Sequence, residues 1–525
     1  MNKQISIFIL FILHFSFYIF HSSIAFAIEV GGHLTEDTIW SPVNNPYLVV
    51  HDVYVDDDVT LTILPGTEVK FAATELVEYD DFSKFIHYNG SNEGKMLWVD
   101  GKVIAEGTED EPIIFTRIQD SLYYHWGVIY LRENADRCVF KYCDFSYSAR
   151  MMILVGILPV GAISIYNEEN IIENCNFYDN FGGVFMQFYP QQIIIKNCDF
   201  FNIQNLNINV AGYADGGIRI SAGASDEAGV ILVSGNRFSE THVSVFHLDV
   251  HHACLYAVYN DFIYQSGIDA GMHNEKSSYF FENDFIGCSD GIDGGGVGDS
   301  LFIQSNRFIC AYNGIDINEG YVEISDNYFE GCGLTTEFAT SGKVYNNILN
   351  NGAAYGPGQV DFFNNISYNN ENGIGICATF QRLSCTNNLS INNLYAFEAS
   401  ESFDNCIFIG NDELEQFSVT GTPLFRNCIT DFEIEYPLID GGGNIIIDSM
   451  QTQSIFEDIQ NGDFHLSPGS IAIDAGFDTL GYYYPFDLDY NHRVWDGDNN
   501  GTAIIDIGPY EYGAPSLGGI EGITY

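Results

Sequence analysis

Asn283-Asp284-Phe285, followed by Gly291-Ile292-Asp293, is the stretch that decides the fold. The same pattern occurs one unit earlier, at 260–262 and 267–269, and one unit later, at 306–308 and 314–316. Similar units return roughly every 18–24 residues from about residue 142 to about residue 430. Such short β-rich units cannot bury an apolar face alone, but stacked units share one core. The repeat therefore predicts an all-β parallel β-helix of about sixteen coils, spaced ~4.8 Å apart.

An asparagine anchors nearly every predicted unit. Asn can adopt the left-handed conformation of a tight corner, and its amide can bond to the coils above and below. Stacked Asn side chains also form hydrogen-bonded ladders. We therefore assign the anchors to stacking rather than to chemistry. Tyr142 replaces Asn in the first unit, and the other anchors are Asn174, Asn197, Asn236, Asn260, Asn283, Asn306, Asn327, Asn347, Asn365, Asn387, Asn405 and Asn427.

Charge and composition narrow the classes of function. The 525 residues include 71 acidic and 19 basic side chains, which gives a formal charge of −52. So negative a surface repels nucleic acid and anionic membranes, and we expect no nucleic-acid partner. It suits an exported protein, or one surrounded by divalent cations.

The twelve cysteines follow the repeat. Most fall in two columns, one directly after the anchor and one containing Cys288, Cys310 and Cys332, so cysteine is expected as a small buried stacking residue. Stacked neighbours would lie within disulfide range, and the sequence leaves their bonding open. Zinc is disfavoured because no pair has CxxC spacing.

The N-terminus is typical of a secretory signal peptide. Lys3 precedes an apolar run, and Ala25-Phe26-Ala27 is a small-x-small cleavage site. We expect a secreted or cell-surface protein, monomeric, with no membrane span after cleavage. The predicted division is a signal peptide (1–27), N-terminal coils (28–135), repeats (136–430), a C-terminal closing segment (431–513) and a Gly-rich tail (514–525).

Several stretches resemble a known group of proteins. "LTILPGTEVKF" (61–71) and "LWVDGKVIAEGTEDEPIIFT" (97–116) are similar to the first coils of secreted bacterial right-handed parallel β-helix repeat proteins, of the pectate-lyase-like superfamily. "FHLSPGSIAIDAG" (464–476), "DLDYNHRVWDGDNNG" (487–501) and "IDIGPYEYG" (505–513) resemble their Asp-Ile-Gly-x-Tyr-Glu closing segment, with Pro509 where Ala is usual. The resemblance implies a right-handed coil. An array also needs a polar cap on its last coil, and we expect this segment to provide it.

The Gly-Ile-Asp triplets provide the candidate catalytic residues, Asp269, Asp293 and Asp316. Because side chains alternate along a strand, the isoleucines face the core and the aspartates face outward. Their spacing predicts one column on adjacent coils, with neighbours ~5 Å apart and the outer pair ~10 Å apart. These separations bracket the retaining and inverting glycosidase geometries, and like charges so close raise one pKa. The nearest basic residues, Arg219 and Arg307, are not expected in this column.

Histidines precede and follow the column. His247, Asp249 and His251 alternate, so they share a strand face, and His273 is expected one coil from Asp249. We expect these four residues to bind substrate near the middle of the rod, where the enzymes that the chain resembles place their grooves. Three functions stay open: contact with a polysaccharide or surface glycan without activity, which we favour; a polysaccharide lyase or glycoside hydrolase; and a purely structural rod. Stacked aspartates can also bind Ca²⁺ without turnover.

A possible Ca²⁺ loop lies in the closing segment. Asp496, Asp498, Asn500 and Gly501 match the first half of a D-x-D-x-N-G loop. Ile507 stands where the loop needs a bidentate Glu, and Asp506 is one residue short. We therefore expect a noncanonical Ca²⁺ site with Asp496, Asp498, Asn500 and Asp506 as ligands, or an Asx-rich turn.

Overall fold

The chain folds almost entirely into short parallel strands, which confirms the predicted parallel β-helix. The computed structural model describes residues 27–75, 94–120, 124–148, 161–187, 191–203, 217–222, 229–239, 246–250, 253–263, 268–270, 277–288, 290–294, 300–336, 339–352, 354–355, 359–370, 374–376, 384–397, 402–415, 422–448, 450–477 and 484–515. The expected signal peptide lies outside these residues, apart from Ala27.

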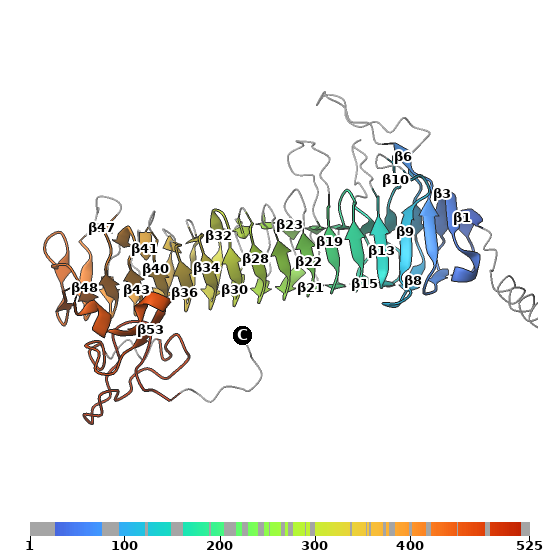
Figure 1. Cartoon of the computed structure of the whole chain (residues 1–525). Helices are drawn as coiled ribbons and strands as arrows, with labels where there is room; N and C mark the ends of the chain where they lie inside the picture. The colour runs from blue at the N-terminus through green and yellow to red at the C-terminus, as the bar shows by residue number, and fades with distance from the viewer. Residues whose placement is uncertain are drawn as a thin grey trace, which may run out of the picture.

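Each coil contributes strands to as many as three faces of a straight rod (Figure 1). Face 1 has seventeen strands among the described residues, close to the expected sixteen coils. They are β2 (Thr38–Trp40), β4 (Thr60–Ile63), β8 (Lys102–Glu106), β12 (Cys138–Lys141), β15 (Glu169–Glu173), β18 (Gln192–Lys196), β21 (Gly229–Ser234), β24 (Ala253–Val258), β27 (Ser278–Phe281), β30 (Ser300–Gln304), β33 (Tyr321–Ser325), β36 (Ser341–Tyr345), β39 (Val360–Phe363), β42 (Ser384–Thr386), β45 (Ser402–Asp404), β48 (Leu424–Arg426) and β50 (Ile439–Asp440).

Face 2 follows face 1 in each coil, in most coils after a two-residue corner. Its strands are β5 (Glu68–Phe71), β9 (Ile113–Arg117), β13 (Cys143–Ser146), β16 (Asn176–Tyr178), β19 (Asp199–Phe201), β22 (Arg237–Ser239), β25 (Asp261–Ile263), β28 (Asp284–Ile286), β31 (Arg307–Ile309), β34 (Tyr328–Glu330), β37 (Ile348–Asn350), β40 (Ile366–Tyr368), β43 (Leu389–Ile391), β46 (Ile407–Ile409), β49 (Ile429–Thr430) and β51 (Ile445–Ile446). β3 (Tyr47–Val55) pairs with β5 at one end and with face 3 at the other.

Face 3 completes the coil. Its strands are β7 (Leu97–Val99), β11 (Ile129–Leu131), β14 (Ile163–Ile165), β17 (Val184–Gln187), β20 (Ile218–Ala222), β23 (Phe246–Val250), β26 (Ile268–Ala270), β29 (Ile292–Gly294), β32 (Asn313–Ile317), β35 (Gly333–Thr335), β38 (Ala354–Tyr355), β41 (Ile374–Ile376), β44 (Tyr395–Phe397) and β47 (Glu413–Glu415). The remaining elements are β1 (Ile28–Leu34) beside β3, the pair β6 (Thr74–Glu75) and β10 (Tyr124–His125), η1 (Pro42–Asn44), η2 (Thr452–Ser454), β52 (Phe456–Asp458), η3 (Ile459–Asn461) and β53 (Asp463–Leu466).

A ladder of stacked phenylalanines fills the core behind face 2. From Phe115 to Phe329, rings on adjacent coils lie 4.7–5.0 Å apart with nearly parallel planes, and all are buried. This spacing is the strand separation itself, so each coil adds one ring to the stack. The aromatic residue of the repeated pattern is therefore part of the core.

The corner between faces 1 and 2 corrects one prediction, because the predicted anchors occupy two adjacent columns rather than one. One column is a buried ladder in which each Nδ2 donates to the Oδ1 of the next member at 2.9–3.1 Å. Its members are Asn236, Asn260, Asn283, Asn306, Asn327, Asn347, Asn365 and Asn388. The other anchors lie one residue earlier in their coils, at left-handed corners (φ 48–56°): Tyr142, Asn174, Asn197, Asn387, Asn405 and Asn427. The Cys that follows most of these corners takes the ladder position. The eleven described cysteines are thiols and form no disulfides with one another.

The closing segment packs mainly along the side of the array, and Phe432 and Ile434 at its start pack against the main core. Strands β50 and β51 still pair with the array, and the chain then folds back along its side (orange to red in Figure 1). Phe464 and Ile507 pack against outward face 2 residues such as Ile366 and Ile407, forming a second hydrophobic core outside the coils. Burying these isoleucines offsets the loss of chain entropy in a segment with few strands of its own.

Corner side chains hold the closing segment in place. Tyr490 donates to Asp326 Oδ1 at 2.6 Å, Arg493 donates to Asn364 Oδ1 at 2.9 Å, and the backbone N–H of Phe477 donates to Asn405 Oδ1 at 2.8 Å. Asn405 therefore bonds to the segment rather than only to neighbouring coils. The segment spans the coils from β33 to β48.

Candidate functional site

One line of positions matched in register runs along face 3. Its register joins His33, Tyr54, Trp98, Tyr130, Ser164, Phe185, Arg219 and His247 on successive strands. A second stretch joins Asp269, Asp293, Asp316, Thr335 and Tyr355. β23, which holds His247, lies beside β26, which holds Asp269. We call this line the face 3 column.

The glycine before each stretch shows that Arg219 and Asp293 hold equivalent places. Gly217 precedes Ile218-Arg219 as Gly291 precedes Ile292-Asp293. A Cβ at either glycine would lie 2.7 Å from the ring of a ladder phenylalanine, so both backbones pass the core at the same point. Arg219 is thus on the line of the aspartates, contrary to expectation, whereas Arg307 lies on face 2.

The predicted catalytic aspartates share one register. Asp269 pairs with Asp293, and Asp293 with Asp316, so the three α-carbons lie on adjacent coils as expected. Asp316 is half-buried between the buried Ile315 and Ile317, which confirms its outward direction. Asn313 Nδ2 donates to Asp316 Oδ2 at 3.4 Å.

The predicted substrate-binding residues fall partly on face 3. His247 and Asp249 are at alternate positions of β23, opposite Arg219 and Ser221 of β20. His251 and His273 lie outside the described residues. The register thus brings His247 onto the face 3 column and places Asp249 two residues along the same strand.

Aromatic residues form the N-terminal part of the column, and the sequence analysis missed them. Tyr54 and Trp98 have ring centroids 5.9 Å apart and nearly parallel planes, whereas Trp98 and Tyr130 are 5.2 Å apart at 68°. All three are half-buried. The sequence did contain a signal for them. Trp98 lies between the buried Leu97 and Val99, and this period-two alternation indicates a strand on which Trp98 faces outward.

Polar groups border these rings. Trp98 Nε1 donates to Asp52 Oδ2 at 3.4 Å, and Arg132 donates to Asp100 Oδ2 at 2.8 Å. Burial raises the pKa of Tyr130, and neighbouring carboxylates add to the rise while Arg132 opposes it. The surface here combines apolar rings with carboxylate acceptors and a guanidinium donor, the combination that a polyhydroxylated ligand needs.

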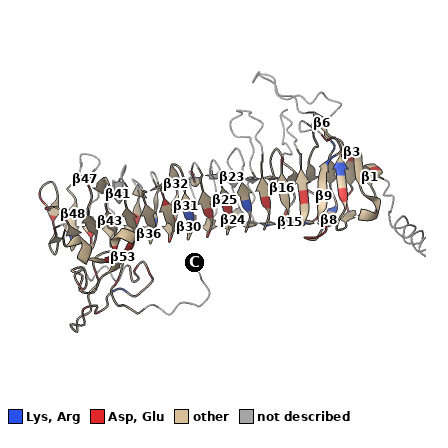
Figure 2. Cartoon of the chain, in the orientation of Figure 1, with Lys and Arg blue, Asp and Glu red and all other residues tan. Residues whose placement is uncertain are grey.

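Face 2 holds another pair of carboxylates on adjacent coils. Asp261 and Asp284 are in register, with Arg237 before them and Arg307 after them. Burial, and then the charge of Asp284, raises the pKa of Asp261, while Arg237 lowers it. Acidic and basic residues are interspersed along this part of the rod in Figure 2. The pair is a charge ladder balanced by arginines, which favours a stacking role.

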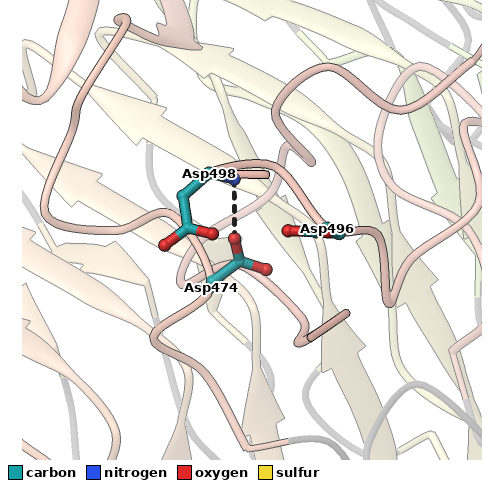
Figure 3. Close-up of side chains that lie close together, drawn as sticks. All are labelled: Asp474, Asp496 and Asp498. Carbon is teal, nitrogen blue, oxygen red and sulfur yellow. Dashed lines mark hydrogen bonds between the residues drawn. The ribbon is translucent and has the colours of Figure 1, made fainter. Parts of the chain in front are cut away.

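The expected metal ligands are only partly brought together. Carboxylate oxygens of Asp496, Asp498 and Asp474 lie within 4.8 Å of one another (Figure 3). Asp474 Oδ2 accepts from the backbone N–H of Asp498 at 2.8 Å, and burial raises the pKa of Asp474. Asp474, which the sequence analysis did not propose, comes from the stretch "FHLSPGSIAIDAG" (464–476). Asn500 Oδ1 instead accepts from the N–H of Thr502 at 2.9 Å.

Asp506 has a different role from the one expected. Its two oxygens accept from the N–H groups of Asp474 and Tyr512, each at 2.6 Å. It is fully buried with Arg493 and Glu511. Burial raises the pKa of Asp506 to about 7 and that of Glu511 to about 8. These groups stabilise the turns of the closing segment rather than face a cation.

The helices of the described residues are short 3₁₀ turns, none long or apolar enough to cross a bilayer. No family model and no curated protein matches the chain.

Proposed function

We propose that this protein is an exported, rigid β-helix that binds carbohydrate along face 3. The observation that carries the proposal is the face 3 column, which aligns aromatic, basic and acidic residues on successive coils. The signal-peptide-like N-terminus and the acidic surface support a place outside the cell, as a secreted or cell-surface protein.

The aromatic part of the column suits the chemistry of sugars. Pyranose rings have apolar C–H faces that pack on aromatic rings, and hydroxyls that bond to carboxylates and guanidinium groups. Because Trp98 and Tyr130 meet at 68°, neither ring covers the face of the other. Asp52 and Arg132 lie at their borders. One polysaccharide strand lying along the rod would contact the rings in succession.

A glycan array followed by calorimetry tests this proposal. Trp98→Ala should weaken binding about tenfold or more, since central aromatic anchors commonly contribute over 1 kcal/mol. Phe302→Ala, which removes an outward ring from face 1, is the matched control and should bind as the parent does. Binding that survives Trp98→Ala, or a parent protein that binds no glycan, would overturn the proposal.

A polysaccharide lyase or glycoside hydrolase is the second candidate. The register of Asp269, Asp293 and Asp316 favours it, because carboxylates on adjacent coils can have the ~5 Å separation of a retaining pair. Arg219 and His247 lie on the same face and provide basic groups. Asp293→Asn should abolish release of reducing ends or unsaturated products from acidic polysaccharides while leaving glycan binding intact. A parent protein without turnover on such a panel excludes this candidate and leaves binding as the function.

A structural Ca²⁺ in the closing segment is a separate proposal. Asp474, Asp496 and Asp498 supply oxygen ligands of the kind Ca²⁺ prefers, and their mutual repulsion would be relieved by a cation. Ca²⁺ would tie the 496–501 loop to the Asp474 turn. The melting temperature should rise on adding Ca²⁺ to chelator-treated protein and should not rise in Asp496→Asn. Equal melting temperatures with Ca²⁺ and with chelator contradict the proposal.

A further inference from the structure

An apolar stripe runs along the outside of face 1. It contains one outward residue from each strand between β8 and β30, beginning with Ile104, Val139, Ile171 and Ile194, which are opposite one another in register. These side chains are half-buried, so each leaves part of its surface in solvent. The stripe ends after Phe302, where Glu323 occupies the next position.

The chain covers a similar row elsewhere but not this one. On face 2, outward isoleucines such as Ile366 and Ile407 are fully buried beneath the closing segment. No described element lies over face 1 between β8 and β24, and Figure 1 shows the closing segment at the other end of the rod. A contiguous apolar row of this length is typical of an interaction surface.

Charged residues border the stripe in a self-complementary order. On one side Glu106, Lys141, Glu173 and Lys196 alternate in sign, and Lys141 Nζ lies 3.2 Å from Glu106 and 4.0 Å from Glu173. On the other side Glu169 follows one coil after Arg137. Only 19 residues of this acidic chain are basic, so several of its few cations gather here.

We propose that two copies of this chain associate through face 1, antiparallel, about a two-fold axis between β12 and β15. This axis sets Val139 opposite Ile171 of the second copy and Ile104 opposite Ile194 of the second copy. Lys141 then meets Glu173 of the second copy. Each contact occurs twice, because a two-fold interface is isologous.

The charges select this axis over others. Arg137 also meets Glu169 of the second copy about this axis, so both borders are complementary. An axis at the middle of the whole stripe would instead bury Lys141 against Phe281 of the second copy and Glu173 against Val258 of the second copy. Both charges would then be buried without a partner, which is unfavourable. A parallel arrangement would set Glu173 opposite Glu169. The antiparallel axis between β12 and β15 avoids all of these contacts.

The overlap is large enough for a specific dimer. It extends from β2 to β24, where Ile39, 64% exposed, meets Tyr256 of the second copy. At ~4.8 Å per strand the overlap is roughly 35 Å long, and three outward columns make it about 15 Å wide. With side-chain relief this approaches about 800 Å² per copy, the usual size of a stable interface. The closing segments lie beyond the overlap.

Sedimentation and light scattering of the full chain test the dimer. The parent should be dimeric at about 10 µM, and Ile171→Lys should be monomeric at the same concentration while keeping its far-UV spectrum. Ile286→Lys, an equally placed outward change on face 2, is the control and should stay dimeric. A monomeric parent at this concentration would overturn the proposal.

A charge exchange tests the axis itself. Lys141→Glu alone and Glu173→Lys alone should each weaken association about tenfold or more, because each places like charges opposite one another twice. Mixing the two variants should restore dimers, now heterodimers. In such a heterodimer the glutamate at position 141 of one copy meets the lysine at position 173 of the other, and the native Glu173 of the first copy meets the native Lys141 of the second. Failure of the mixture to dimerise would refute the antiparallel axis, and a change in folding alone cannot produce rescue on mixing.

Discussion

Replacing Asn283 by alanine should show how strongly the buried Asn ladder stabilises the rod. Asn283 Oδ1 accepts from the N–H and from Nδ2 of Asn260, both at 2.9 Å, and its Nδ2 donates to Ala257 O at 2.8 Å and to Asn306 Oδ1 at 2.9 Å. Alanine removes these four bonds. It leaves two buried donors of Asn260 without an acceptor, at about 1–3 kcal/mol each. We expect a loss of about 4 kcal/mol.

A thermal melt followed by circular dichroism measures this loss. Unfolding of about 490 residues carries an entropy of about 1 kcal/mol per degree, so the melting temperature should fall about 4 °C. The melting temperature of Asn283→Cys should fall only about half as far. The sulfur can donate to the carbonyl oxygen of Ala257, as Cys198 Sγ donates to Ile172 O at 3.7 Å. Gln192→Ala, an exposed change on face 1, is the control. Two results would refute this reasoning. One is a melting temperature of Asn283→Ala within a degree of that of the parent. The other is a melting temperature of Asn283→Cys below that of Asn283→Ala.

Three further predictions concern the closing segment and the core. The pKa values of Asp506 and Glu511 are raised by burial to about 7 and about 8, so their contribution to stability is greatest below about pH 4 and declines as pH rises through these values. The pKa of His465 is raised to about 9, first by its bond to a neighbouring aspartate, and its contribution is present below pH 6.5 and lost through pH 9. Proteolysis of the closing segment should therefore accelerate from pH 5 to pH 9, relative to cleavage of an unstructured control substrate by the same protease. A cleavage rate that does not change with pH after this correction would contradict the prediction. Phe464→Ala should remove about 3–4 kcal/mol from the second core and expose the segment to protease without altering the far-UV spectrum; an unchanged cleavage rate would disprove the docking role. Gly314→Ala places a Cβ 2.6 Å from a ladder phenylalanine ring and should lower stability by about 1–3 kcal/mol in urea denaturation, whereas an unchanged midpoint would show that the ring can move.

The array itself was predictable from the sequence because its physical signals are local. The recurrence of Asn-x-Phe sets the coil length, and the alternation around Ile315 and Ile317 sets which side chains face inward. The register of the aspartates followed from their nearly equal spacing and their common Gly-Ile-Asp pattern. The one-residue offset between the corner position and the ladder position could not be predicted from the spacing, because Asn suits both positions. Asn174 lies at the corner and Asn283 lies in the ladder.

Contacts distant in sequence escaped prediction. Arg493 meets Asn364 and Tyr490 meets Asp326, more than a hundred residues earlier, and no periodicity encodes these contacts. One signal did exist: the outward face 2 position changes from Asp284 and Arg307 to Ile366 under the closing segment. An apolar residue at an outward position marks a covered surface, and the same reasoning identifies the stripe on face 1.

The docking of the closing segment has a mechanical consequence. A stack of coils joined only to their neighbours can be peeled from its end, one coil at a time. Here, tension that enters through the closing segment is received at the corners of several coils at once, including those of Asp326, Asn364 and Asn405. Their bonds would be loaded together in shear, parallel to the rod, rather than broken in sequence. The free edge of the last coil is thereby relieved of load.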